Sequence, residues 1–274
     1  MSAAAVTARD LPSDPGTLRS ALHVVEYQLL SYRRSYRGSL FSSFVQPALF
    51  LAAMGLSLGG IVDQAGAGGR LAGGSYLDFL APGLLAAAGM QAAFSEATFP
   101  IIAQIVWVRT FLAMVATPVS ATAVVIGQFT WITIRLAMVT GIFTLVIALF
   151  GAAHGPGLLL AWPAAMLTGL AFAGPIAAWS ATRRTEGSFN ILFRFGMTPL
   201  FLFSGTFFPV EQLPSVLQPL AMLTPLYHGV ALARGFAIGG AEPLAMAGHV
   251  AYLVLLATLG IAASLVTFRR TLIK

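Results

Sequence analysis

The chain has 274 residues, of which 58% are hydrophobic and only 9% are charged. A soluble globular domain typically carries about 25% charged residues, so this composition and a mean hydropathy of +0.86 indicate a protein solvated largely by lipid. The net charge is +6, and most of the basic residues lie beside apolar segments. This placement favours contact with the membrane surface over contact with nucleic acid. The absence of cysteine excludes disulfides, thiol catalysis and thiolate metal sites, and the histidines show no metal-ligand spacing (His23, His154, His228 and His249).

The N-terminal region divides into two parts. Residues 1–16 are small, polar and proline-containing, and are expected to be disordered. Residues 17–38 carry apolar side chains at steps of three and four, with arginine, histidine and glutamate between them (Leu18, Leu22, Val25, Leu29, Tyr32 and Tyr36). This pattern predicts an amphipathic helix in the cytoplasmic membrane interface. The alternative is a plain basic tail before the first membrane span.

Six apolar segments follow, each long enough to cross the hydrocarbon core, which takes about 20 helical residues. The predicted spans are 40–61, 77–102, 120–149, 158–180, 189–208 and 245–267. The expected fold class is therefore an all-α polytopic membrane protein, with its transmembrane domain at 39–268 and a short cytoplasmic tail at 269–274.

The distribution of basic residues predicts the orientation, because cytoplasmic segments are enriched in lysine and arginine. With the N-terminus inside, the outer segments contain only Arg70 and Arg234 outside the spans. All other basic residues outside the spans are then cytoplasmic (Arg9, Arg19, Arg33, Arg34, Arg37, Arg109, Arg183, Arg184, Arg194, Arg269, Arg270 and Lys274). Both termini are predicted to be cytoplasmic, in a bacterial plasma membrane.

The segment 209–243 is too apolar to be a free loop on the outer side. Four prolines within it break any single long helix (Pro209, Pro214, Pro219 and Pro225). We expect short helices at the outer membrane boundary, partly re-entrant, because irregular backbone at that depth needs protein or water to satisfy it.

The sequence also lacks recognisable catalytic chemistry. A phosphate-binding loop requires a lysine after its glycines, and the only lysine is the last residue, Lys274. HExxH and GxSxG are both absent, and Ser204 lacks the preceding glycine of a nucleophile elbow. No catalytic residue, metal ligand or bound cofactor is predicted.

Polar residues within the spans are few, and ionisable residues there are functional candidates. Glu96 and Arg135 either pair with each other or line a polar path; the alternatives are an interfacial carboxylate and a snorkelling or structural arginine. An aromatic cluster either faces a hydrophobic substrate or makes ordinary lipid and helix contacts (Phe201, Phe203, Phe207 and Phe208). The spacing of Gly55 and Gly59 fits close helix packing or chance.

Three stretches together resemble the ABC-2 type permeases, the membrane subunits of ATP-binding-cassette exporters. They are YLDFLAPGLLAAAGMQAAFSEATF at 76–99, RTFLAMVATPVSATAVVIGQFTW at 109–131 and SGTFFPVEQLPSVLQPLAMLTPLYHGVALARG at 204–235. The resemblance is greatest to the group that contains nodulation-factor export and anthracycline-resistance permeases. It implies six spans, an interfacial helix before the first span, and short outer helices between spans five and six.

The resemblance also implies partners. Two permease subunits, either two copies of one chain or two sister chains, pair with two separate ATPase subunits. ATP and magnesium bind to the ATPase, and the conduit lies between the permeases. Membrane lipid is a further partner, and nucleic acid is not.

By the same resemblance, the turn at 103–119 transmits the motion of the ATPase. The residues that it assigns to this coupling are Gln104, Trp107, Arg109, Thr110, Phe111, Thr117 and Pro118, with Glu26 of the interfacial helix as a second contact. The alternative for this segment is a simple tight connection. The candidate transport path comprises Glu96, Trp131, Arg135, Phe203 and Phe207. Gln128 departs from the pattern, because close relatives often have an acid at that position, and this leaves the substrate class open.

The sequence therefore predicts an exporter permease without an ATP site, driven by a partner ATPase. A drug or antibiotic is the first expectation for the cargo, and a lipid-linked glycan or lipo-oligosaccharide the second. The alternatives are a secondary transporter that works without an ATPase and an intramembrane enzyme.

Overall fold

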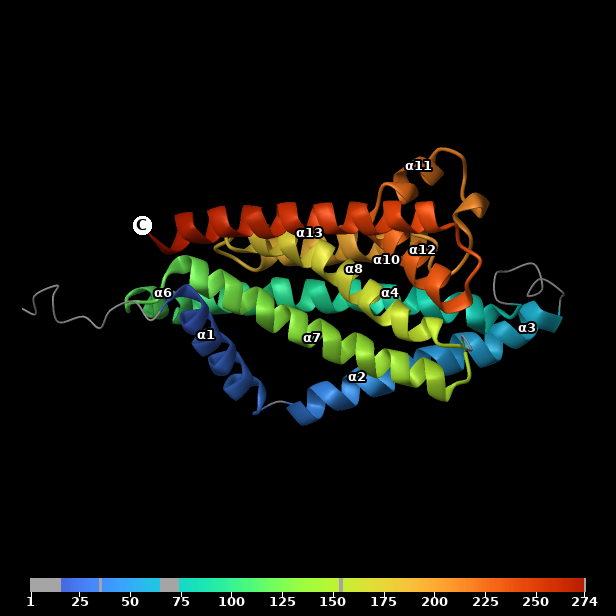
Figure 1. The fold of residues 1–274 in the computed structure, drawn as a ribbon, viewed down its shortest axis with the longest axis horizontal. Coiled ribbons are helices and arrows are strands. Elements are labelled where there is room, and N and C mark those ends of the chain that lie inside the picture. The colour runs from blue at the N-terminus through green and yellow to red at the C-terminus, as the bar shows by residue number, and fades with distance from the viewer. Residues whose placement is uncertain (1–15, 35, 65–73, 153–154, 274) are drawn as a thin grey trace, which may run out of the picture.

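The computed structural model describes residues 16–34, 36–64, 74–152 and 155–273. Within these ranges the chain is helical and contains no strand, as expected for an all-α membrane protein. The long helices run side by side along the longest axis of the molecule (Figure 1). Most of the predicted tail at 1–16 and the loop arginine Arg70 lie outside the described residues.

Two helices replace the single amphipathic helix predicted at 17–38. Helix α1 (Thr17–Tyr32) ends in a turn at Arg33 and Arg34, and α2 begins at Tyr36. The predicted apolar stripe is not the face that contacts the protein, because Leu18, Leu22 and Leu29 are all exposed. The packed face contains small or polar residues instead (Ser20, Ala21, Val24 and Gln28).

A close crossing between α1 and α7 explains why the packed face of α1 contains small residues. Gly127 of α7 lies so near α1 that a methyl group on it would be 2.6 Å from the Val24 Cβ. Only small side chains allow two backbones to approach in this way. The leucines of α1 then face outward, where lipid can cover them.

The first long helix is continuous but not uniform. It comprises α2 (Tyr36–Leu51), the π-helix η1 (Ala52–Leu58) and α3 (Gly59–Gln64). Pro47 removes one helical hydrogen bond just before the wider π turn. The apolar part, Tyr36–Val62, begins four residues before the predicted span. Gly55 and Gly59 both lie against α4, at Leu77 and Tyr76.

Helix α4 (Tyr76–Ala97) is the centre of the bundle. Ser75 caps its first turn by accepting a hydrogen bond from the amide of Asp78 at 3.1 Å. Residues 79–87 are all buried, and the helix packs against α7, α8 and α12. Because protein surrounds it, its sequence is apolar on every side and its hydrophobic periodicity is weak.

The polypeptide continues from α4 through α5 (Phe99–Ile102) and the π-helix η3 (Ala103–Trp107) to α6 (Thr110–Val115). The apolar helix therefore extends to Trp107, five residues beyond the predicted end of the second span. The next long helix, α7 (Ala121–Leu149), is capped by Ser120 and agrees with the predicted third span.

Helices α8 (Gly157–Ser180) and α13 (Pro243–Leu272) pack closely along much of their length. Their backbones meet at two glycines, since a methyl group on Gly174 would lie 2.9 Å from the Gly260 backbone. Ser264 donates a hydrogen bond to the Gly174 carbonyl at 3.0 Å, and Thr271 donates to the Ala181 carbonyl at 3.2 Å. The contact between α8 and α13 therefore continues to the C-terminal ends of both helices.

Five helices within the described residues are long and apolar enough to cross a membrane. The predicted fifth span, 189–208, is instead covered by α9 (Gly187–Ile191), the π-helix η4 (Leu192–Met197) and α10 (Thr198–Phe203). Together these 17 residues are slightly short of a full crossing. Six spans therefore remain a prediction.

Short helices follow, as predicted for 209–243. They are η5 (Val210–Gln212), α11 (Leu217–Met222) and α12 (Pro225–Ile238). The last of these is not superficial, because Leu226, Val230 and Leu232 are buried and α12 packs against α4, α8 and α13.

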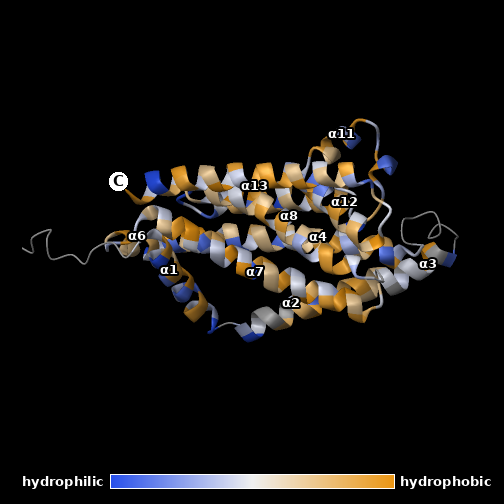
Figure 2. Ribbon diagram, in the orientation of Figure 1, coloured by the Kyte–Doolittle hydropathy of each residue, from blue (hydrophilic) through white to orange (hydrophobic). Residues whose placement is uncertain are grey.

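The two ends of the bundle differ in charge. We call the end that carries α6 and the C-terminus the basic end, and the end that carries α3 and α11 the distal end (Figure 1). The last turn of α13 contains Arg269 and Arg270, and Arg183 and Arg184 follow α8 at the same end. The long helices between the two ends are mostly hydrophobic (Figure 2).

Candidate functional site

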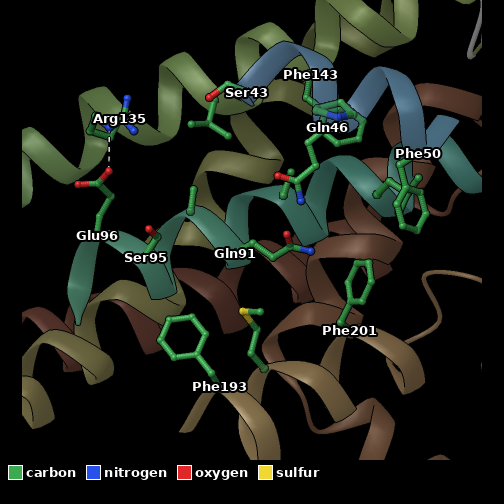
Figure 3. A pocket seen from close by; sticks show the side chains of 16 residues that line it. Ser43, Gln46, Phe50, Gln91, Ser95, Glu96, Arg135, Phe143, Phe193 and Phe201 are labelled. Carbon is green, nitrogen blue, oxygen red and sulfur yellow. Dashed lines mark hydrogen bonds and ion pairs between the residues drawn. The ribbon is translucent and has the colours of Figure 1, made fainter. Parts of the chain in front are cut away.

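A cavity of about 620 Å³ lies between α2, α4, α7 and the segment formed by η4 and α10. Its polar side chains are a charged pair, two glutamines and two serines (Glu96, Arg135, Gln46, Gln91, Ser43 and Ser95). Phe50, Phe143 and Phe201 lie toward the distal end, away from the charged pair (Figure 3). The cavity is therefore amphipathic, with the charged pair at one end and the two glutamines farther along, nearer these rings, while Phe193 lies at the end of the charged pair (Figure 3).

The charged pair joins two long helices. The Arg135 Nε of α7 donates to the Glu96 Oε1 of α4 at 2.8 Å (Figure 3). The two side chains are only 12% and 14% exposed, so each charge depends on the other for stabilisation. Glu96 and Arg135 therefore pair with each other, and both line the cavity.

The other residues of the predicted transport path do not line this cavity. Trp131 is buried beside it and packs edge-on against Tyr32, with ring centroids 5.6 Å apart. Phe207 lies one contact away, 5.0 Å from the Phe201 ring and 6.0 Å from the Phe50 ring. Phe203 is 44% exposed on the outside of α10. Phe203 therefore points away from Phe201 and from the cavity, because a helical turn directs neighbouring positions to different sides.

Helix α1 reaches the cavity through an aromatic contact. The Arg135 guanidinium carbon lies 4.5 Å from the centroid of the Tyr32 ring. A cation over an aromatic face is attracted by the ring quadrupole, and more strongly where water is excluded. Tyr32 therefore holds the side of Arg135 that does not face Glu96.

A second set of contacts links α1 to the segment 103–119. The side-chain amide of Gln28 donates to the Gln104 carbonyl oxygen at 3.2 Å and to the Gln128 carbonyl oxygen at 2.6 Å. All three glutamines are buried, so these hydrogen bonds are costly to leave unmade. The hydroxyls of Tyr27 and Thr110 lie 3.4 Å apart.

The residues assigned to ATPase coupling fall into three groups. Trp107, Arg109 and Thr117 are exposed on the surface of the basic end. Gln104 and Phe111 are buried, the latter against Phe268 of α13 at a ring distance of 6.0 Å, while Thr110 and Pro118 are half-buried. Glu26 is exposed on α1, where its Oε2 lies 3.4 Å from the His23 Nδ1.

The backbone at the corner of this segment is unusual. Arg109 has φ of 60° and ψ of 25°, a left-handed conformation that few residues other than glycine adopt. It ends the helical run from α4 and turns the chain into α6. Trp107 and Val108, 52% and 69% exposed, precede this corner and form an apolar surface at the basic end. An exposed surface of this kind is typical of a protein contact.

Sequence reasoning missed several polar residues that the structure brings together. In the sequence Gln46 and Gln91 are two unrelated residues of different spans. In the structure α2 and α4 place both in the lining of one cavity. Arg234, predicted in an outer loop, has its guanidinium donating to the Phe79 and Gly205 carbonyls at 3.1 and 3.0 Å. Burial lowers the pKa of Arg234 to about 10, so it remains a cation at neutral pH.

A histidine pair at the distal end was also missed. The Nδ1 atoms of His228 and His249 lie 2.8 Å apart, with Tyr252 stacked on His228 at a centroid distance of 3.9 Å. These residues are 21 positions apart, and only the packing of α12 against α13 joins them. In the described residues no group of three histidine or acidic side chains has the arrangement of a metal site.

Comparison with known proteins agrees with this architecture. The sequence pattern of the ABC-2 type transporter family matches residues 20–238, which is most of the chain. The protein belongs to the ABC-2 type transporter family. It is thus an integral membrane protein and a transport subunit, and membership implies an ABC ATPase as its partner.

Several relatives match most of the chain in sequence. Nodulation protein J of Bradyrhizobium diazoefficiens is 31% identical over 246 residues, which is 89% of this chain and 91% of the relative. Nodulation protein J of Rhizobium leguminosarum bv. viciae is 29% identical over 247 residues, covering 89% and 92%. The family match at 20–238 includes the helices that line the cavity as well as α12.

Proposed function

We propose that this protein is the permease of an ATP-driven exporter that moves an amphipathic molecule outward across the bacterial plasma membrane. The basic end lies in the cytoplasm, where its arginines follow the positive-inside tendency. Both termini are then cytoplasmic. Two copies of the ATPase bind ATP and magnesium, and two permease subunits, copies or sisters, form the complete transporter.

The amphipathic cavity is the observation that carries this proposal. An exporter of a lipid-like molecule must accommodate a polar headgroup and an apolar tail in one site. Glu96, Arg135 and the two glutamines supply the polar part, and the phenylalanines supply the apolar part. Ligand sites typically combine an apolar lining with a few placed polar groups in this way.

The polar lining favours a lipid-linked glycan or lipo-oligosaccharide over a cationic drug. A cationic drug needs an available carboxylate, and the Glu96 carboxylate is already engaged by Arg135 at 2.8 Å. Gln46, Gln91, Ser43 and Ser95 are neutral donors and acceptors, which suit the hydroxyls of a sugar. The nodulation relatives support the same cargo class, whereas drug efflux has no support beyond the sequence resemblance.

The contacts of α1 provide a route from the ATPase to this cavity. Movement of the segment 103–119 would shift α1 through the contacts of Gln28 and Tyr27 with this segment. About one turn farther along α1, Tyr32 contacts Arg135, and Arg135 pairs with Glu96. A shift of α1 along α7 therefore changes the charged pair, and with it the affinity of the cavity for the cargo headgroup.

Purification and transport test this function together. The tagged chain, extracted in mild detergent, is expected to bring down an ABC ATPase that hydrolyses ATP. Proteoliposomes of the complex should move a fluorescent lipid-linked oligosaccharide to the other leaflet only with ATP. A chain that purifies without an ATPase and transports with a proton gradient would contradict the proposal.

A further inference from the structure

A groove of about 440 Å³ runs between α8 and α13 on the side of the bundle away from the cavity. The lining is almost entirely apolar (Pro175, Ala178, Trp179, Thr182, Leu256, Leu259, Gly260, Ala263 and Thr267). The glycine contact between Gly174 and Gly260 brings the helix backbones together, and only small side chains such as Ala178 and Ala263 fill the space above it. The groove is therefore a consequence of the close packing of the two helices.

The groove extends to Trp179, Thr182 and Thr267 near the basic end, and four arginines lie close to these residues in the sequence. Thr271 of α13 donates to the Ala181 carbonyl, so the end of α13 touches the end of α8. Arg183 and Arg184 follow this contact on one side, and Arg269 and Arg270 precede it on the other. Glu186 is the only acidic residue in the segment 181–187, so the arginines outnumber acids at this mouth.

One arginine is already oriented along the groove. The Arg183 guanidinium carbon lies 5.0 Å from the centroid of the Trp179 ring, and Trp179 lines the groove. Tryptophan at a membrane interface places an apolar body among lipid tails and its edge among headgroups. The Trp179 and Arg183 pair therefore marks the level at which the apolar groove meets the headgroup region.

We infer that this groove binds an anionic glycerophospholipid, with an acyl chain in the groove and its phosphate among Arg183, Arg184, Arg269 and Arg270. Charge complementarity selects this occupant, because a cationic mouth on an apolar trough fits a negative headgroup with a hydrocarbon tail. Guanidinium groups bind phosphate with two parallel hydrogen bonds. Basic pockets between transmembrane helices on the cytoplasmic side commonly bind such headgroups.

The bound lipid would hold α8 and α13 together at the surface and is separate from the cargo. The two sites share no lining residue. The inference does not depend on which molecule is exported, since it concerns retained lipid and not transport.

Native mass spectrometry of the purified protein in defined mixed micelles of phosphatidylglycerol and phosphatidylcholine tests it. The wild type is expected to retain phosphatidylglycerol in preference to phosphatidylcholine. Each neutralised arginine among Arg183→Gln, Arg269→Gln and Arg270→Gln should weaken retention about fivefold, the factor for one cation near an anionic surface. Ala263→Phe fills the groove without changing the charge and should also reduce retention.

Arg33→Gln with Arg34→Gln is the matched control, because it removes charges near the membrane without touching the groove. Each variant is first checked for an unchanged elution profile and melting temperature. Equal retention of the two lipids, an equal loss in the control, or full retention in Ala263→Phe would overturn the inference. Displacement of the lipid by free glycerol phosphate would overturn it too, since that would indicate a simple anion site.

Discussion

The two sides of the α4 helix are built differently. On one side α4 meets α8 and α12 through glycines, and a methyl group on Gly89 would lie 3.1 Å from the Ala165 carbonyl carbon. On the other side α4 faces the cavity, whose remaining walls include the π-helix η4 and a helix that continues into η1. Close backbone packing leaves no room for motion, whereas π turns mark sites where helices are easily rearranged.

This contrast divides the bundle into a rigid part and a part that can move. Helices α4, α8, α12 and α13 form a fixed support, and α1, α2 and the segment 187–203 form the part that responds to the ATPase. The exposed apolar residues of α2, α3 and η4 are also available for contact with the second permease of the proposed transporter (Phe41, Leu49, Ile61 and Phe195). Four changes test the comparison, beginning with the largest expected effect.

Gly89 and Ala88 are neighbours on α4, of which Gly89 faces α8 and Ala88 lines the cavity. Gly89→Val forces the side chain into the α8 backbone and should destabilise the protein by about 3 kcal/mol, with little folded protein recovered. Ala88→Val enlarges a residue that lines the cavity and should fold normally while transport falls. Melting temperature in detergent and yield from membranes measure both. Equal loss of stability in the two variants would remove the distinction between the two sides.

The charged pair tests whether the cavity side depends on electrostatics. Glu96→Gln leaves Arg135 without its carboxylate and should cost roughly 2 kcal/mol, less than the value for a fully buried pair, together with most of the transport. The double variant with Arg135→Gln leaves no unpaired charge and should be more stable than either single variant. A double-mutant cycle of melting and transport measures the coupling. Additive effects would show that the two residues act independently.

Gln28 tests the link between the ATPase side and the cavity. Gln28→Leu leaves the amide groups of Gln104 and Gln128 without this partner and should destabilise the protein by about 1 kcal/mol. ATP hydrolysis should continue with fewer molecules transported per ATP, because α1 no longer follows the segment 103–119. Leu22→Ala, on the exposed face of the same helix, is the control. An unchanged ratio of transport to hydrolysis in Gln28→Leu would contradict the link.

The histidine pair tests the fixed side by pH. Burial lowers the pKa of His228 below its usual value near 6.5, and the neighbouring His249 adds to this effect. The folded protein therefore binds fewer protons than the unfolded chain between the lowered pKa and about 6.5, and its stability rises with pH across that window. The melting temperature should fall on acidification through this range, and the fall should be smaller in His228→Gln. Identical pH profiles would show that the histidine contributes nothing.

The sequence predicted the helical class, the long spans and the short distal helices, since these depend on hydrophobic length and proline. Periodicity identified an apolar stripe on α1 that is exposed in the structure, at Leu18, Leu22 and Leu29, but it could not show which residues of this helix pack against α7. No sequence pattern identified Gln28 or Gln46 as a site residue, because the residues around each of them come from other helices and are distant in the sequence. Phe203 and Phe207 differ by four positions, yet the chain leaves the helix at Ser204, so helical spacing could not place them.

The absence of cysteine allows the central claim to be tested by single-cysteine labelling. ATP-dependent transport of a lipid-linked oligosaccharide is measured in proteoliposomes before and after a maleimide reagent, for Gln91→Cys within the cavity and Phe203→Cys outside it. The account predicts that the reagent blocks transport in Gln91→Cys, that cargo slows this modification, and that Phe203→Cys is unaffected. Blockage only at Phe203→Cys, or no protection of Gln91→Cys by cargo, would place the transport path elsewhere.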